Sequence, residues 1–146
     1  MEPNTVVKFG LGFLFLAAGF YVFYYTKFFA DANGRTSLDL FTFGWFIITF
    51  GELCLSPIGM SVMTKLSPHK TQAVMMGMWF LASAYGQYFA GLLGANIAEA
   101  SENASNLEKL TVYADGYKDL AIYALVAGLV LIAISPLVKK LMQEVK

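Results

Sequence analysis

Residues 50–61 read FGELCLSPIGMS and place one carboxylate, that of Glu52, inside a long apolar segment. The surrounding run, residues 40–64, contains no other charged residue. An α-helix rises about 1.5 Å per residue, so a run of this length can cross the roughly 30 Å hydrocarbon core of a bilayer. The stretch therefore predicts a membrane-spanning helix that carries one acidic group at membrane depth.

Three further segments, residues 9–26, 71–98 and 120–138, contain no Asp, Glu, Lys or Arg. In the whole chain of 146 residues, 58% are hydrophobic and 14% are charged, which is too apolar for an ordinary soluble domain. The segments do not alternate as the strands of a membrane barrel would. We expect an all-α membrane protein of one transmembrane domain, residues 1–146, with four transmembrane helices at approximately residues 6–26, 38–65, 71–99 and 117–140.

The basic residues indicate how these helices are oriented. If the N-terminus is cytoplasmic, six of the ten basic residues face the cytoplasm and four face the other side. Because cytoplasmic loops carry an excess of Lys and Arg, we expect a multi-pass protein of the plasma (inner) membrane with both termini in the cytoplasm. The inner set is Lys8, Lys65, Lys70, Lys139, Lys140 and Lys146, and the outer set is Lys27, Arg35, Lys109 and Lys118.

Several functional classes lack their usual residues in this sequence. Cys54 is the only cysteine and His69 the only histidine, so no cysteine metal cluster is possible. No nucleophile and base pair and no phosphate-binding loop is recognisable either. We expect no catalytic residues, no metal site, no cofactor and no nucleic-acid partner, and therefore no enzyme.

Glu52 is the residue with the strongest chemical signal. A charged side chain near the bilayer centre costs at least about 2.5 kcal/mol, so Glu52 should avoid lipid. Ser56 follows one helical turn later and Gly59 one turn after that, so the three share a face. Pro57 removes a backbone donor and predicts a break or bend, which at membrane depth is tolerated against protein or a water-filled cavity.

No basic residue of the chain lies at the depth of Glu52. Its partner would then be a substrate amine, a cation of another chain, or a bound proton. A structural role stays open, in which a neutral Glu52 side chain bonds a neighbouring carbonyl and holds two helices together.

The third apolar segment carries two further features. Trp79 and Ser83 lie one turn apart with Phe80 beside them, and the short turn before this segment brings Trp79 toward the Glu52 helix. Small residues also recur at every fourth position, which predicts a tight seam with another helix. This stripe consists of Gly86, Ala90, Gly94 and Ala98.

Two motifs together resemble one known family. GELCLSPIGMSVMTKLSP, residues 51–68, and MMGMWFLASAYGQYFAGLL, residues 75–93, are similar to the C-terminal part of the proton-dependent oligopeptide transporter family, in the major facilitator superfamily. The resemblance covers essentially the whole chain, which would correspond to the last four helices of a twelve-helix fold. It implies an incomplete C-terminal half of a transporter.

The resemblance also implies a function for particular residues. The family couples the uptake of di- and tripeptides to proton entry. Glu52 would bind the peptide amino terminus and take part in proton coupling, while Ser56, Trp79, Phe80 and Ser83 would form the wall of the peptide site. The implied partners are a di- or tripeptide, a proton, the lipid bilayer and the missing N-terminal half of the transporter.

Because alternating access needs two halves around a central site, the four helices alone should not transport peptide by this mechanism. Two alternatives remain open. One is a dimeric four-helix proton-coupled antiporter, although the known small antiporters carry their membrane glutamate on the first helix and this chain carries it on the second. The other is a non-transporting four-helix membrane assembly protein in which Glu52 is a polar clamp.

Overall fold

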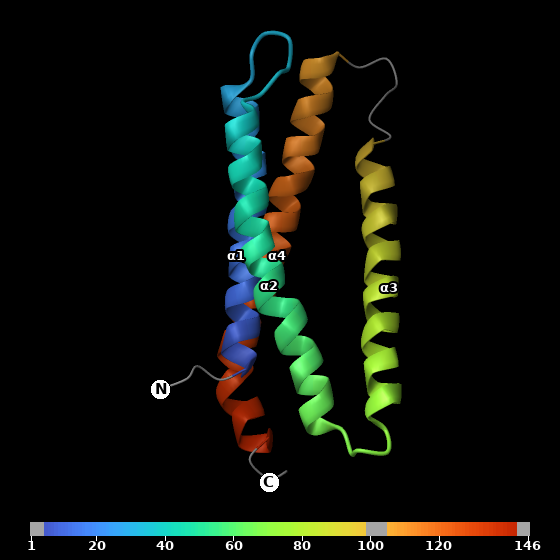
Figure 1. Ribbon diagram of the computed structural model, residues 1–146. Coiled ribbons are helices and arrows are strands. Elements are labelled where there is room, and N and C mark those ends of the chain that lie inside the picture. Colours follow the sequence, from blue (N-terminus) through green and yellow to red (C-terminus); the bar gives the residue numbers. More distant parts are fainter. Residues whose placement is uncertain (1–4, 99–104, 143–146) are drawn as a thin grey trace.

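The computed structural model describes residues 5–98 and 105–142, and the described residues form helices and connections without a β-strand. Helices α1 and α2 run antiparallel, α3 returns along the bundle, and α4 passes back beside α1, so the first helix begins and the last one ends at the same end of the molecule (Figure 1). The prediction of an all-α fold with four long helices is confirmed. Their bounds are α1 Thr5–Tyr25, α2 Leu38–Leu66, α3 Gln72–Ala98 and α4 Asn106–Met142, with a short 3-10 helix η1 at Thr26–Phe29.

Three spans in the described residues are long and apolar enough to cross a membrane: Thr5–Phe29, Leu38–Leu66 and Asn106–Lys140. Helix α3 contains no charged residue and has sufficient length, but it does not reach the same hydropathy. Its glycines and the polar side chains of Gln72, Ser83 and Gln87 lower the average. A helix of this composition is suited to contact with protein as well as with lipid.

Helix α1 is the centre of the bundle, since it packs along both α2 and α4. Glycines allow the backbones to touch at these crossings: a Cβ placed on Gly51 of α2 would lie 3.0 Å from the carbonyl oxygen of Gly12. On the α4 side, a Cβ on Gly128 would lie 3.0 Å from the carbonyl oxygen of Gly10. Close backbone contact of this kind holds helices together in lipid, where the hydrophobic effect gives no advantage.

Helix α3, in contrast, stands apart from the other three (Figure 1) and contacts them sparsely. A Cβ added at Gly86, Gly91 or Gly94 would meet no atom within 4 Å. The prediction that the small residues of this helix form a tight seam is therefore wrong for the described chain. Two of them, Ala90 and Gly94, instead border an open groove of about 280 Å³ against α1 and α4.

Helix α4 begins at Asn106, well before the predicted start near residue 117. Its first turn is held by a reciprocal cap. The Ser105 backbone N–H donates to Oε2 of Glu108 at 2.9 Å, and the Glu108 N–H donates to the Ser105 hydroxyl at 3.3 Å. Such a capping box satisfies two backbone donors that a helix start otherwise leaves unpaired, so the polar sequence here continues the helix rather than forming a loop.

Replacing Ser105 by alanine should fray the first turns of α4. Loss of an N-cap side chain costs about 1 kcal/mol, which corresponds to about fivefold faster amide exchange in the first turns. Hydrogen exchange of residues 106–112 measures this. Ser37→Ala is the matched control, because Ser37 is the N-cap of α2 and its side chain makes no capping hydrogen bond. Equal effects of both substitutions would contradict the role of the cap.

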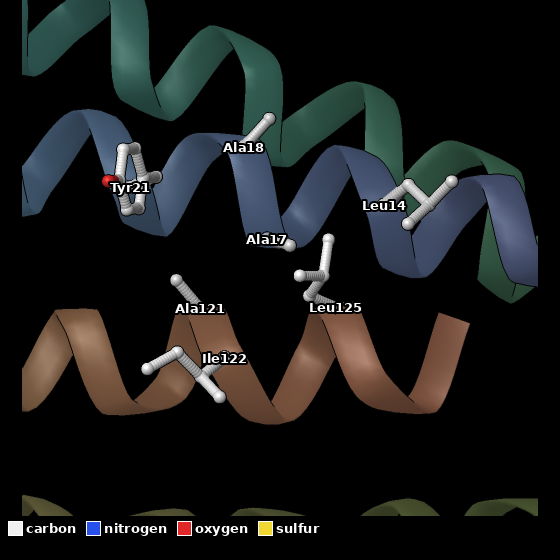
Figure 2. A pocket seen from close by; sticks show the side chains of 7 residues that line it. All are labelled: Leu14, Ala17, Ala18, Tyr21, Ala121, Ile122 and Leu125. Atoms are coloured by element: carbon white, nitrogen blue, oxygen red, sulfur yellow. The ribbon is translucent and has the colours of Figure 1, made fainter. Parts of the chain in front are cut away.

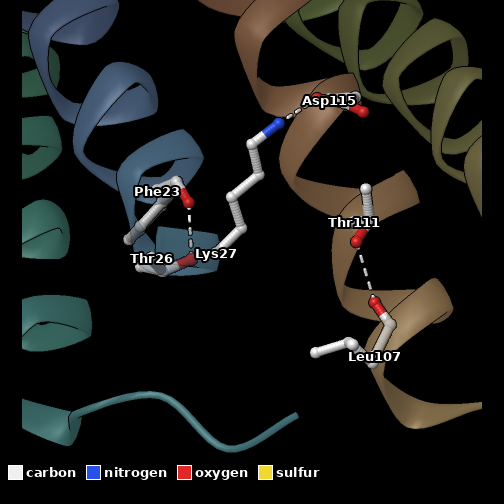
Figure 3. A network of polar contacts seen from close by, with 6 residues as sticks. All are labelled: Phe23, Thr26, Lys27, Leu107, Thr111 and Asp115. Atoms are coloured by element: carbon white, nitrogen blue, oxygen red, sulfur yellow. Dashed lines mark hydrogen bonds and ion pairs between the residues drawn. The ribbon is translucent and has the colours of Figure 1, made fainter. Parts of the chain in front are cut away.

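A polar cluster joins α1 to α4 at the end of the molecule that lies opposite the first and last helix ends (Figure 3). The Lys27 ammonium donates to Oδ1 of Asp115 at 2.6 Å and also lies 4.2 Å from the centre of the Tyr24 ring. The Thr26 hydroxyl donates to the carbonyl oxygen of Phe23 at 2.6 Å. The ion pair of Lys27 with Asp115 therefore connects η1 to α4.

Candidate functional site

Helix α2 continues through Pro57 without interruption, so of the two sequence-based expectations, a break or a bend, the break is wrong. Its second half turns away from α1 and toward α3 (Figure 1). Proline lacks a backbone donor and clashes with the preceding turn, so Pro57, the proline inside α2, can account for this change in direction. The bend separates the α1-facing part of α2 from a part that meets α3.

Glu52 and Ser56 lie side by side on an exposed face of α2, one turn apart. Neighbouring Gly51 faces α1 and is buried, so the α1 contact directs the Glu52 side chain away from that helix. Within the described residues, Glu52 forms no ion pair and Ser56 makes no hydrogen bond. A carboxylate and a hydroxyl are thus presented together to whatever lies beside this face.

Trp79 of α3 packs against the same face of α2 at Gly59, nearer the C-terminal end of that helix. Its ring packs so tightly on Gly59 that the structure leaves no room for a Cβ at that position. Phe9 of α1 meets the Trp79 ring edge-on, with ring centres 6.5 Å apart. Gly59 follows Glu52 by seven residues, so the contact lies about 10 Å along the helix from the carboxylate.

Phe80 and Ser83 lie on the exposed part of α3, and Phe80 is 59% exposed. The Ser83 hydroxyl donates to the carbonyl oxygen of Trp79 at 3.1 Å. The structure therefore brings Trp79 into contact with α2, whereas Phe80 and Ser83 remain on a helix that the described chain leaves uncovered. Sequence reasoning missed the contribution of Phe9, because a contact between distant helices leaves no local pattern.

The described residues contain no group of three His, Cys, Asp or Glu side chains that could hold a metal ion. The arrangement around Glu52 is one carboxylate, one hydroxyl and aromatic rings beyond them. A site of this kind can bind a cation or exchange a proton, and aromatic walls add apolar contact.

The sequence profile of the POT family matches residues 1–113. The peptide transporter YePEPT of Yersinia enterocolitica is 37% identical over 99 residues, which cover 66% of this chain and 19% of the relative. A di-/tripeptide transporter of Lactococcus lactis subsp. cremoris is 31% identical over 150 residues, which cover 99% of this chain and 27% of the relative.

Solved structures agree with these sequence matches. One, from work on substrate recognition in proton dependent oligopeptide transporters, is similar to 97% of this chain with a TM-score of 0.77 and 30% identity. Another, a bacterial homologue of the human drug peptide transporters, is similar to 93% with a TM-score of 0.74 and 32% identity. The chain spans 30% and 28% of the length of these two structures, and 19% and 27% of the two relatives above.

Proposed function

We propose, from the premise that this chain belongs to the POT family, that it forms the C-terminal wall of the central peptide site in a proton-coupled di-/tripeptide symporter. The observation that carries this proposal is the exposed face of α2, on which Glu52 and Ser56 stand together without a partner among the described residues. The similarity to a di-/tripeptide transporter over nearly the whole chain supports the substrate class.

The peptide ammonium is the cation that we assign to Glu52. A carboxylate at membrane depth is unfavourable without an opposite charge, and the free amino terminus of a peptide supplies one. Ser56 lies one turn away and can accept or donate a further hydrogen bond. Trp79, Phe80 and Ser83 would complete this wall, with the aromatic rings covering a peptide side chain.

Proton coupling at Glu52 follows from the same reasoning. When the peptide leaves, the carboxylate loses its counter-ion, and a proton can bind at the same oxygen atoms. If a proton and the peptide ammonium only competed for the Glu52 carboxylate, the protein would exchange one for the other across the membrane. Symport in one direction therefore requires a second protonatable group, which we place in the missing N-terminal half.

We place the chain in the plasma (inner) membrane with both termini in the cytoplasm. The first helix begins and the last one ends at one end of the bundle (Figure 1). The order of the helices assigns five of the nine described basic residues to that side, namely Lys8, Lys65, Lys70, Lys139 and Lys140. The missing N-terminal half would cover the exposed faces of α2 and α3. In this arrangement the chain acts in transport and not as an enzyme.

A chimeric transporter tests the proposed function. This chain is placed in the Lactococcus lactis di-/tripeptide transporter instead of the matching 27% of that protein, and the chimera is reconstituted in vesicles. We expect an inward proton gradient to drive uptake of a labelled dipeptide above that of empty vesicles. The 146-residue chain alone should show no such uptake.

Two results would contradict the proposal. Proton-driven uptake by the chain alone would favour a small antiporter or another complete transporter. A chimera that folds and inserts correctly but binds and transports no peptide would favour a membrane assembly protein. The parent Lactococcus transporter, reconstituted in parallel, serves as the positive control.

A further inference from the structure

A second feature lies between α1 and α4, away from the Glu52 face. Aliphatic side chains and Tyr21 line an open groove of about 530 Å³ (Figure 2). Ala17 of α1 and Ala121 of α4 form its floor and are 5% and 4% exposed. Ala18 and Ile122 line its rim. The size is in the range of roughly 300–1,000 Å³ that is usual for sites of small organic ligands.

The groove leads to a cationic end. The Tyr21 ring lies 5.7 Å from the Tyr24 ring, and the Lys118 ammonium lies 5.7 Å from the centre of the Tyr24 ring. Lys118 also precedes Ala121 and Ile122 by one turn of α4, so it lies on the same side of the helix as the groove, one turn closer to the start of α4.

The two lysines at this end differ in their partners. Lys27 is paired with Asp115, as Figure 3 shows. Lys118 has the ring contact with Tyr24, but within residues 5–98 and 105–142 it has no carboxylate partner. Its neighbour Asp119 projects from α4 about 100° further around the helix. Among the described residues, the Lys118 ammonium therefore stands at the end of the groove without a direct ion pair.

This end of the groove coincides with the membrane boundary that the sequence defines. The uncharged run of α1 ends after Thr26, and that of α4 begins at Leu120. Tyrosine rings and lysine ammonium groups prefer this level, where apolar chains meet polar head groups. We therefore expect the apolar groove to lie within the hydrocarbon layer and Lys118 to lie at the level of the lipid phosphates.

We propose that the α1–α4 groove is a phospholipid site, in which an acyl chain fills the apolar groove and the lipid phosphate binds Lys118. Charge complementarity decides the occupant, because a phosphate diester is the anion that every phospholipid presents at this depth. Tyr21 and Tyr24 would contact the glycerol region between the two. The site is independent of the peptide transport proposed above, since it lies on another face of the bundle.

Native mass spectrometry of the 146-residue chain tests this site. The chain is released from detergent that contains either phosphatidylglycerol or a galactolipid with the same acyl chains and no phosphate. A lysine near an anionic lipid head group typically gives about a fivefold gain in affinity, so we expect about fivefold more bound phosphatidylglycerol than galactolipid. Lys118→Gln should abolish this preference, while Lys139→Gln, at the opposite end of α4, should retain it.

A second variant tests the acyl-chain part. Ala18→Phe fills the rim of the groove without changing its floor, so it should reduce binding of both lipids to a similar extent. A preference for phosphate that persists in Lys118→Gln, or equal binding of both lipids to the unchanged chain, would overturn the proposal. Loss of bound phospholipid in the chimera, or a chain dimer that excludes lipid, would also overturn it, because protein would then fill the groove.

Discussion

Glu52→Gln in the chimeric transporter is expected to abolish proton-driven dipeptide uptake. Glutamine keeps the size of the side chain but supplies neither the charge that binds an ammonium nor a group that exchanges a proton. Removing one partner of a desolvated charge pair costs about 2 kcal/mol or more, so dipeptide affinity should fall about thirtyfold or more. Uptake in reconstituted vesicles and binding of the same dipeptide are the two measurements.

Two controls separate the proposed role of Glu52 from a structural one. Asp39→Asn removes a carboxylate from the first turn of the same helix and should leave uptake nearly unchanged. An N-acetylated dipeptide has no ammonium, so its binding should not respond to Glu52→Gln. Equal losses for the free and the acetylated peptide would show that Glu52 acts in some other way than through the peptide amino terminus.

Gly51→Leu is expected to separate α1 from α2. A Cβ at Gly51 already lies 3.0 Å from the carbonyl oxygen of Gly12 and 3.1 Å from the backbone nitrogen of Leu16, and backbone atoms cannot rotate away. Overpacking of this kind costs about 1–3 kcal/mol, and leucine adds further atoms beyond the Cβ. The free energy of unfolding of the chain in mixed micelles measures the loss.

Gly86→Leu is the matched control for this prediction. The substitution is the same and also falls in the middle of a long helix, but nothing lies within 4 Å of the new Cβ. The stability of the isolated chain should therefore change little. Leucine has a higher helix propensity than glycine, so propensity cannot account for a loss of stability in either variant. If Gly86→Leu destabilised the chain as strongly as Gly51→Leu, the α1–α2 contact would not be the cause.

The four helices could be predicted from the sequence because each contains an apolar run of spanning length with no charged residue or, in α2, only Glu52. The start of α4 could not, since its first turns are polar and fall outside the apolar run. A signal was present in the spacing of Ser105 and Glu108, which is that of a capping box. Hydropathy marks the part of a helix that lies in lipid and not the part that extends beyond it.

The candidate site was accessible to sequence reasoning only in part. Helical spacing places Glu52 and Ser56 on one face, and the structure has both side chains exposed there. The contact of Trp79 with Gly59 and Phe9 depends on how three helices cross, which no single segment encodes. The stripe of small residues on α3 predicts a close helical neighbour. None of the described helices packs against Gly86 or Gly94, so the pattern does not say which helix that neighbour would be.

The central position of α1 affects the order in which the protein assembles in the membrane. Chains enter the bilayer from the N-terminus, so α1 and α2 can pair soon after synthesis. The other side of α1, with Gly10, receives α4 only after α3 has crossed the membrane. Until α4 arrives, that side of α1 lacks the helix that covers it in the completed bundle.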